Sequence, residues 1–127
     1  MNTRSFALRR LPMAFGWLTK RPVPDEVTDA WLRPARVDRA VRRDVLRFIR
    51  AIDSADTLAA AEQLHTFERP VLLAWASEDR AFPLEHARRL AARFTDAVVE
   101  EIPDSYTFVP EDAAEDLARL VVGFASH

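Results

Sequence analysis

The sequence of 127 residues contains no cysteine and only two glycines. The absence of cysteine excludes disulfides, thiolate catalysis and cysteine-ligated metal sites. Long hydrophobic runs are also missing, because no segment approaches the ~20 apolar residues that a membrane-spanning helix needs. We therefore expect no membrane partner. Hydrophobic residues make up 49% and charged residues 30% of the chain, which is an ordinary balance for one globular domain.

The N-terminus carries a short apolar run behind a pair of arginines. Residues 11–18, which follow Arg9 and Arg10, could pass for a weak signal peptide. However, Pro12 breaks the run, and the segment lacks a small-x-small cleavage site. We interpret the segment as part of the fold and expect a cytoplasmic protein.

The two parts of the chain carry opposite net charges. Residues 1–50 contain 12 basic and 5 acidic side chains, whereas residues 51–127 contain 6 basic and 15 acidic ones. Such an asymmetry indicates a change of architecture or a separate surface role. The net charge of the whole chain is -2, which gives no reason to expect nucleic acid as a partner.

Residues 1–68 are predicted to be helical. A short helix begins at Asp25 and ends before Pro34, because the residue that precedes a proline avoids the α region. A longer helix is predicted from about Arg36 to Ile52. Its apolar residues recur at spacings of three and four and form one stripe: Val37, Val41, Val45, Phe48, Ile49 and Ile52. The arginines away from this stripe are Arg36, Arg39, Arg43, Arg47 and Arg50.

A third helix is predicted from Thr57 to about His65, with Ser54 or Asp56 as its N-cap. After Pro70 the pattern changes to alternating strands and helices. The continuous apolar run 71–76 is typical of a strand that is buried on both faces of a parallel sheet.

The remaining elements complete a βαβα unit. A helix is predicted over residues Leu84 to Phe94. Pro83, just before them, can occupy the first helical position, where its missing N–H costs nothing. A second strand at residues 97–102 and a last helix opened by residues 110–112 follow. The fold class is therefore α/β, with a helical segment at residues 1–68 and the βαβα unit at residues 69–127.

Two parallel strands do not make a free-standing sheet. The outer edge of strand 71–76 would also expose unpaired backbone groups. Either further strands come from elsewhere, or the N-terminal helices fold back over the gap. We favour the first alternative.

Asp79 is the candidate functional residue. It lies four residues after Trp75, in the loop at the carboxyl end of the first strand, where the reactive groups of open parallel sheets collect. A carboxylate there could orient a histidine and stabilise its imidazolium form. The alternative is an aspartate that hydrogen-bonds the backbone of its own turn. Position alone favours this alternative.

The residues around Asp79 resemble a known family. Residues 69–83 read Arg-Pro-Val-Leu-Leu-Ala-Trp-Ala-Ser-Glu-Asp-Arg-Ala-Phe-Pro, which is similar to the penultimate strand and acid loop of the α/β-hydrolase superfamily. The similarity continues through a strand that ends at Ile102-Pro103 and a turn that leads into the C-terminal helix. Residues 1–68 resemble, more loosely, the helical lid of epoxide-hydrolase-like and haloalkane-dehalogenase-like members. The resemblance implies that Asp79 is the acid of a catalytic triad.

The sequence departs from the family pattern at three places. Ala76 stands where the family favours glycine before the acid, and Thr107 stands where the family places its catalytic histidine. Threonine has no pKa near neutrality and cannot act as a general base. The nucleophile elbow Gly-x-Ser-x-Gly is also missing, because the only glycines are Gly16 and Gly123.

Other residues give weaker signals. His65, His86 and His127 are scattered without metal-ligand spacing, so we expect no metal and no cofactor. The arginine face of the longer helix could bind nucleic acid, but a solvated surface is the better interpretation, since Asp38 and Asp44 interrupt it. Five aromatic residues could line a substrate pocket or pack in a core, and this choice stays open: Phe15, Trp17, Trp31, Trp75 and Phe82.

The sequence thus predicts an α/β-hydrolase-like protein, either a fragment or a degenerate member. Its parent would hydrolyse an ester, an epoxide or a carbon–halogen bond of a small apolar substrate, with an incomplete triad in this chain. We expect the chain alone to be inactive. The alternative is a non-enzymatic module that binds a partner or a second copy through its exposed sheet edge.

Overall fold

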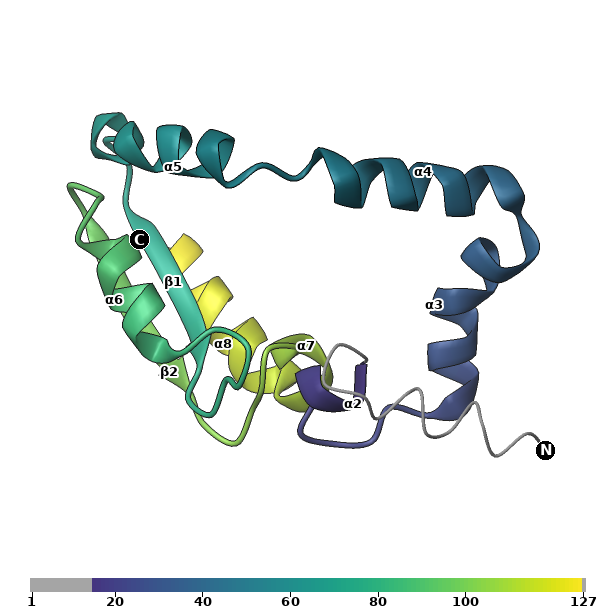
Figure 1. The fold of residues 1–127 in the computed structure, drawn as a ribbon. Coiled ribbons are helices and arrows are strands. Elements are labelled where there is room, and N and C mark those ends of the chain that lie inside the picture. Colours follow the sequence, from purple (N-terminus) through teal and green to yellow (C-terminus); the bar gives the residue numbers. More distant parts are fainter. Residues whose placement is uncertain (1–14, 127) are drawn as a thin grey trace.

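The computed structural model describes residues 15–126, without the side chains of Phe15 and Gly16 (Figure 1). Residues 11–14 of the segment 11–18, which we considered as a signal peptide, therefore lie outside the described residues. The Phe15 side chain and His127 also lie outside them. The helices of the first half are α2 (Phe15–Leu18), α3 (Asp25–Val37), α4 (Arg39–Ala51), α5 (Ser54–Glu62) and the 3-10 turn η1 (Leu64–Thr66). The second half contains β1 (Val71–Ala76), α6 (Leu84–Ala91), β2 (Ala97–Ile102), α7 (Val109–Asp112) and α8 (Ala114–Ala125).

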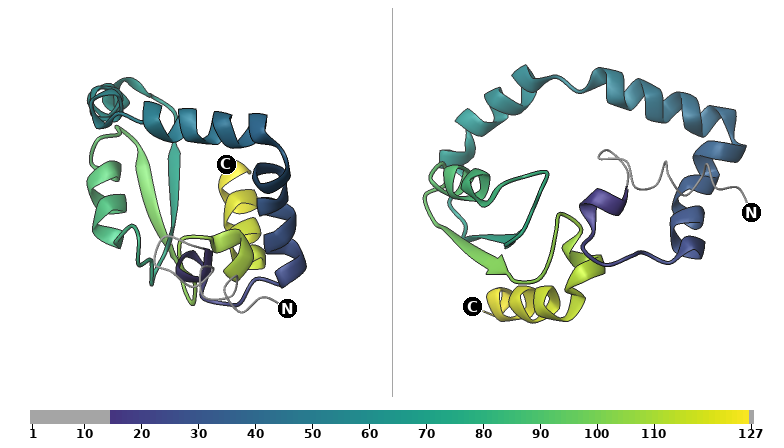
Figure 2. Two further views of the ribbon diagram at one scale, coloured as in Figure 1. Left: turned by 45° about the vertical axis from the view of Figure 1, so that its right-hand side comes forward. Right: turned by 60° about the horizontal axis from the view of Figure 1, so that its bottom comes forward.

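Both predicted strands are confirmed in place and direction. β1 and β2 pair in parallel, with a register that runs from Val71 opposite Ala97 to Ala76 opposite Ile102. α6 contacts both strands and α8 contacts β1, and the two helices lie on opposite sides of the sheet (Figure 2). A small core forms where the strands end, at Ala76, Ile102 and Val109. The core therefore lies directly beneath the loops that follow the strands.

The boundaries of the first helices differ from the prediction. α3 continues through Pro34 to Val37, so the predicted end before Pro34 is wrong. The restriction before proline is a preference, and Pro34 lies in the last turn of α3, where its carbonyl still accepts the N–H of Asp38 at 3.0 Å. The next helix begins at Arg39 instead of Arg36, because Asp38 is extended and its carboxylate caps the amide of Ala40 at 2.7 Å.

The predicted cap of the third helix is also wrong. The carboxylate of Asp53 accepts the amide of Ala55 at 2.8 Å, so α5 begins at Ser54. The N-cap is thus Asp53, the residue before Ser54, and neither of the two predicted caps, Ser54 and Asp56, has this role. Near the other end, His65 belongs to the separate turn η1.

Three boundaries in the second half need smaller corrections. α6 ends at Ala91 instead of Phe94, and Pro83 is its N-cap instead of its first helical residue. The predicted last helix is divided into α7 and α8, because Ala113 adopts a non-helical backbone with φ -145° and ψ 51°.

The sheet has two strands within residues 15–126. Five of the six residues of β1 are half-buried and only Ala76 is buried, so the strand is not covered on both faces as predicted. α3 and α4 arch away from the sheet, and α4 contributes no buried residue (Figure 1). Within residues 15–126, α3 and α4 therefore do not fold back over β1. None of its helices is long and apolar enough to cross a bilayer.

Candidate site at the carboxyl ends of the strands

Asp79 sits in the loop that follows β1. One carboxylate oxygen, Oδ1, accepts the amides of Ala81 and Phe82, both at 2.8 Å. The Asp79 amide in turn donates to the carbonyl of Ala76 at 3.4 Å. The turn-forming interaction that the sequence suggested is therefore present, and it fixes the carboxylate above the end of β1.

Thr107 reaches the same carboxylate from the loop after β2. Its Oγ1 donates to Oδ1 of Asp79 at 2.7 Å. Parallel strands end at one edge of a sheet, so loops that lie 28 residues apart in sequence meet there. The structure thus brings the two predicted site residues, Asp79 and Thr107, into direct contact.

This contact can orient a side chain but cannot move a proton at neutral pH. A threonine hydroxyl donates a hydrogen bond to a carboxylate, yet it has no pKa near 7 and takes up no proton from a nucleophile. An imidazole at position 107 would meet a carboxylate that is already held by two backbone amides. The arrangement therefore fixes a carboxylate at the end of β1, and its neighbour Thr107 is not a general base.

Asp112 is a functional residue that the sequence reasoning missed. Its carboxylate is buried and accepts four hydrogen bonds of 2.8–2.9 Å from three backbone amides, those of Lys20, Arg21 and Tyr106. Residues 18–21, which we call the strap, are thereby attached to the loop that holds Thr107. The sequence signal at Asp112 was only that of an acid in the first turn of a helix.

Two cations of the strap bind the acidic residues of both loops. Lys20 Nζ lies 2.5 Å from Glu78 Oε1 and 2.7 Å from Asp104 Oδ1, and Arg21 also forms an ion pair with Asp104. The hydrogen bond from Lys20 and the charge of Arg21 lower the pKa of Asp104. The hydrogen bonds to Asp104 and Glu78 raise the pKa of Lys20. Both shifts favour the charged forms.

The aromatic residues of the described part of the chain are exposed or half-buried beside the strand-end loops. The Trp75 indole N–H donates to the carbonyl of Phe82 at 2.8 Å, while the Phe82 side chain is 51% exposed. Trp31 is 39% exposed and meets Phe108 edge to face at 6.5 Å. Trp17 is half-buried. These rings border the strand-end loops without forming a sealed core.

Two histidines, His65 and His86, lie in the described part of the chain. His65 is exposed, with Nδ1 2.8 Å from the carbonyl of Glu62, and His86 is exposed on α6. His127 lies outside the described residues. Among residues 15–126, no group of histidine, cysteine, aspartate and glutamate side chains is suited to hold a metal ion.

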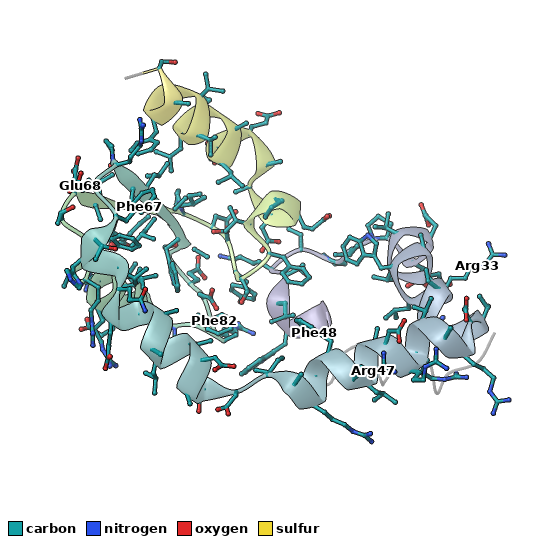
Figure 3. All side chains as sticks on the ribbon, turned by 90° about the horizontal axis from the view of Figure 1, so that it is seen from above. Arg33, Arg47, Phe48, Phe67, Glu68 and Phe82 are labelled. Atoms are coloured by element: carbon teal, nitrogen blue, oxygen red, sulfur yellow. The ribbon has the colours of Figure 1, made fainter. Side chains whose placement is uncertain are left out.

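The long basic helix is exposed on both faces. Its arginines border an open surface of α4, and Asp44 forms ion pairs with Arg43 and Arg47. The apolar stripe is also exposed, which the sequence did not predict: Phe48 is 70%, Ile49 57% and Val45 44% accessible. Figure 3 shows Phe48 and Arg47 together on this helix.

Comparisons with known proteins give distant relatives. An uncharacterized hydrolase YugF of Bacillus subtilis is 30% identical over 105 residues, which are 83% of this chain and 37% of that protein. Haloalkane dehalogenase 2 of Mycobacterium tuberculosis and of Mycobacterium bovis is 32% identical over 104 residues, which are 78% of this chain and 36% of those proteins. No protein-family model matches.

The chain therefore spans about a third of the length of the curated relatives that it matches. The matched stretch includes about 80% of this chain and joins it to proteins named as hydrolases. The resemblance of this chain to the α/β-hydrolase superfamily is thereby confirmed.

Proposed function

We propose that this chain provides the acid loop and the helical lid of an α/β-hydrolase-type site. The observation that carries the proposal is the 2.7 Å hydrogen bond between Thr107 and Asp79. It joins the residue that the resemblance assigns as the acid to the residue at the histidine position. This contact supports the assignment of Asp79 as the acid, with threonine at the position of the base.

The reaction of the parent protein is hydrolysis of an ester, an epoxide or a carbon–halogen bond. The names of the relatives, a hydrolase and haloalkane dehalogenases, support this class. Asp79 would orient an imidazole and stabilise its protonated form, while the nucleophile and the base come from other residues. The exposed aromatic rings beside the loops favour a small apolar substrate.

The division of the chain follows the same proposal. Residues 1–68 are the lid segment, and residues 69–127 are the C-terminal βαβα part of a larger parallel sheet. The half-buried β1 supports this arrangement, since a strand so apolar gains stability from a further strand at its open edge.

The substitution Thr107→His tests the proposed acid. An imidazole beside the Asp79 carboxylate is expected to have a pKa about 1 unit above the ordinary ~6.5, because the negative charge favours the protonated ring. NMR titration of the new histidine measures it. The second substitution Asp79→Asn should return this pKa to ~6.5, while exposed His86 serves as an internal control. A new histidine that titrates near 6.5 with Asp79 intact would refute the assignment.

Neither the natural chain nor Thr107→His is expected to hydrolyse p-nitrophenyl acetate above the rate of buffer, because the sequence has no nucleophile elbow. Steady-state assays of the purified 127-residue chain measure this. Turnover that disappears in Asp79→Asn would show that the chain is an enzyme by itself.

Self-association is a second candidate function, supported by two exposed apolar surfaces. These are the open edge of β1 and the apolar face of α4. α4 carries five arginines against one aspartate, whereas residues 51–127 carry an excess of acidic side chains. The basic α4 of one copy could therefore meet a surface of opposite charge in residues 51–127 of a second copy, which favours a homodimer.

A further inference from the structure

We infer that the strap, residues 18–21, positions the acid loop against the Thr107 loop, with Lys20 as the positioning residue that joins them. This inference rests on the proposed function, because it concerns how the acid is aimed. The strap lies near the start of the lid segment in sequence and yet contacts residues that lie 58 to 92 positions later. No sequence pattern indicated this role.

The backbone of the strap is attached at several points to the Thr107 side of the site. The carbonyl of Leu18 accepts the amide of Phe108 at 2.8 Å. The amides of Lys20 and Arg21 donate to the buried carboxylate of Asp112, which also holds the amide of Tyr106. Thr107 thus lies between two residues, Tyr106 and Phe108, whose amides belong to this network.

The Lys20 side chain then extends from the strap to the other loop. Its Nζ binds Glu78, the residue immediately before Asp79, and Asp104, three residues before Thr107. The direct backbone bond between the loops, from the Glu78 amide to the carbonyl of Ser105, is long at 3.3 Å. Lys20 therefore adds a further connection between the loops, besides this backbone bond and the 2.7 Å bond from Thr107 to Asp79.

The positive charge of Lys20 counteracts repulsion between the acidic side chains of the two loops. Glu78, Asp79 and Asp104 place three carboxylates on two adjacent loops, and like charges at short range repel. Lys20 contacts two of these carboxylates, and Arg21 reinforces the contact with Asp104. The Lys20 side chain is only 28% exposed, so solvent screens its ion pairs less than those on open helix surfaces. Without this cation, the two loops should move apart and Asp79 should lose its neighbour at position 107.

Lys20→Met in the Thr107→His background separates positioning from a through-space charge effect. Loss of a nearby cation, by itself, would raise the pKa of the new imidazole. Loss of positioning would instead remove the imidazole from Asp79 and lower its pKa toward ~6.5. We expect a decrease of at least half a unit, measured by NMR titration. Lys20→Arg should restore the raised value, because it keeps the cation.

Arg88→Met is the matched control, since it removes a different cation, whose side chain is exposed, from a 3.4 Å ion pair with Glu101 on β2. It should leave the pKa of the imidazole unchanged. Retained dispersion in ¹H–¹⁵N spectra shows that each variant is folded. A raised pKa in Thr107→His that Lys20→Met increases or leaves unchanged would overturn the role of the strap, while the role of Asp79 would stand.

A second measurement in the natural background does not depend on Asp79. The amide of Glu78 bonds across the loops, so its hydrogen exchange reports their separation directly. Lys20→Met should accelerate this exchange about tenfold, whereas Arg88→Met should not change it. Unchanged exchange in Lys20→Met would overturn the inference whatever the imidazole does. Faster exchange together with an ordinary pKa in Thr107→His would instead refute the proposed function alone.

Discussion

Asp112 combines burial with a full set of backbone donors. Its two oxygens accept bonds from Lys20, Arg21 and Tyr106, so one side chain joins the strap to the Thr107 loop. Hydrogen bonds to a charged group contribute about 1.5–3 kcal/mol each, and a buried donor that loses its acceptor adds a desolvation penalty. This single residue is therefore expected to matter for the stability of the whole site.

Asp112→Asn should lower the free energy of unfolding by about 2–3 kcal/mol. The asparagine side chain has one acceptor oxygen, and its NH₂ group would point its two hydrogens at backbone N–H groups that now bind the second carboxylate oxygen. Urea titration followed by circular dichroism measures the change. Asp44→Asn on α4 is the control, because the Asp44 carboxylate is exposed, and it should change stability by less than about 0.5 kcal/mol. An equal effect of the two substitutions would contradict the role of Asp112.

Single residues were predictable only where a local pattern exists. Asp79 follows a strand at a characteristic spacing, so its loop could be recognised before its contacts were known. Asp112 and Lys20 act through partners 92 and 58 residues away, and nothing in their neighbouring sequence identifies those partners. The contact of Thr107 with Asp79 followed from parallel topology, which brings the two strand ends to one edge.

Two helices of the first half, α4 and α5, begin at single capping side chains. Asp38 separates α3 from α4, and Asp53 sets the first residue of α5. In each case the carboxylate accepts the amide two residues later, at 2.7 Å and 2.8 Å. Because α4 is exposed and buries no residue, local interactions of this kind provide much of its stability.

Asp38→Ala should destabilise α4 by about 1 kcal/mol through loss of its N-cap. Hydrogen exchange of the amides in the first turn of α4 should become faster by about fivefold. Asp38→Ser keeps an accepting oxygen and should preserve most of the protection. If the alanine and serine variants exchange alike, the cap contributes little and packing on α3 holds the helix.

The presence of the helices and strands was more predictable from the sequence than the residues at which they begin and end. Both strands and the major helical regions were predicted from hydrophobic patterns and from the residues that begin or end helices, since these signals are local. The end of α3 was misjudged because the penalty before Pro34 is small in a last turn, and the cap of α5 because two other capping residues follow Asp53.

At the scale of the molecule, the helices of the first half form an open arc that joins β1 at one end and lies beside α7 at the other (Figures 1 and 2). The exposure of the apolar face of α4 is the least expected feature, because the periodicity of that helix is what usually identifies a buried face. Periodicity shows that a helix has an apolar face, but it does not show which body covers that face.

If a second copy covers α4, Phe48→Asp should weaken the homodimer at least tenfold, since it places a charge in the centre of the apolar face. Sedimentation equilibrium at several concentrations measures the dissociation constant. Val122→Asp on α8 changes an equally accessible residue, 66% against 70% exposed, and should leave the dimer intact. A natural chain that remains monomeric at high concentration would refute self-association.

The attachment of the strap has a consequence for how the arc can move. Residues 22–70 leave the strand-end loops at the strap and return to the sheet at β1, so the segment is fastened at both of its roots. Because both ends of the segment are attached, it is expected to rotate about the line that joins the strap and β1. It is not expected to open by pivoting about one end alone. Access for a substrate would then come from the side of this segment, and lengthening the connection between α4 and α5 would enlarge that opening at little entropic expense.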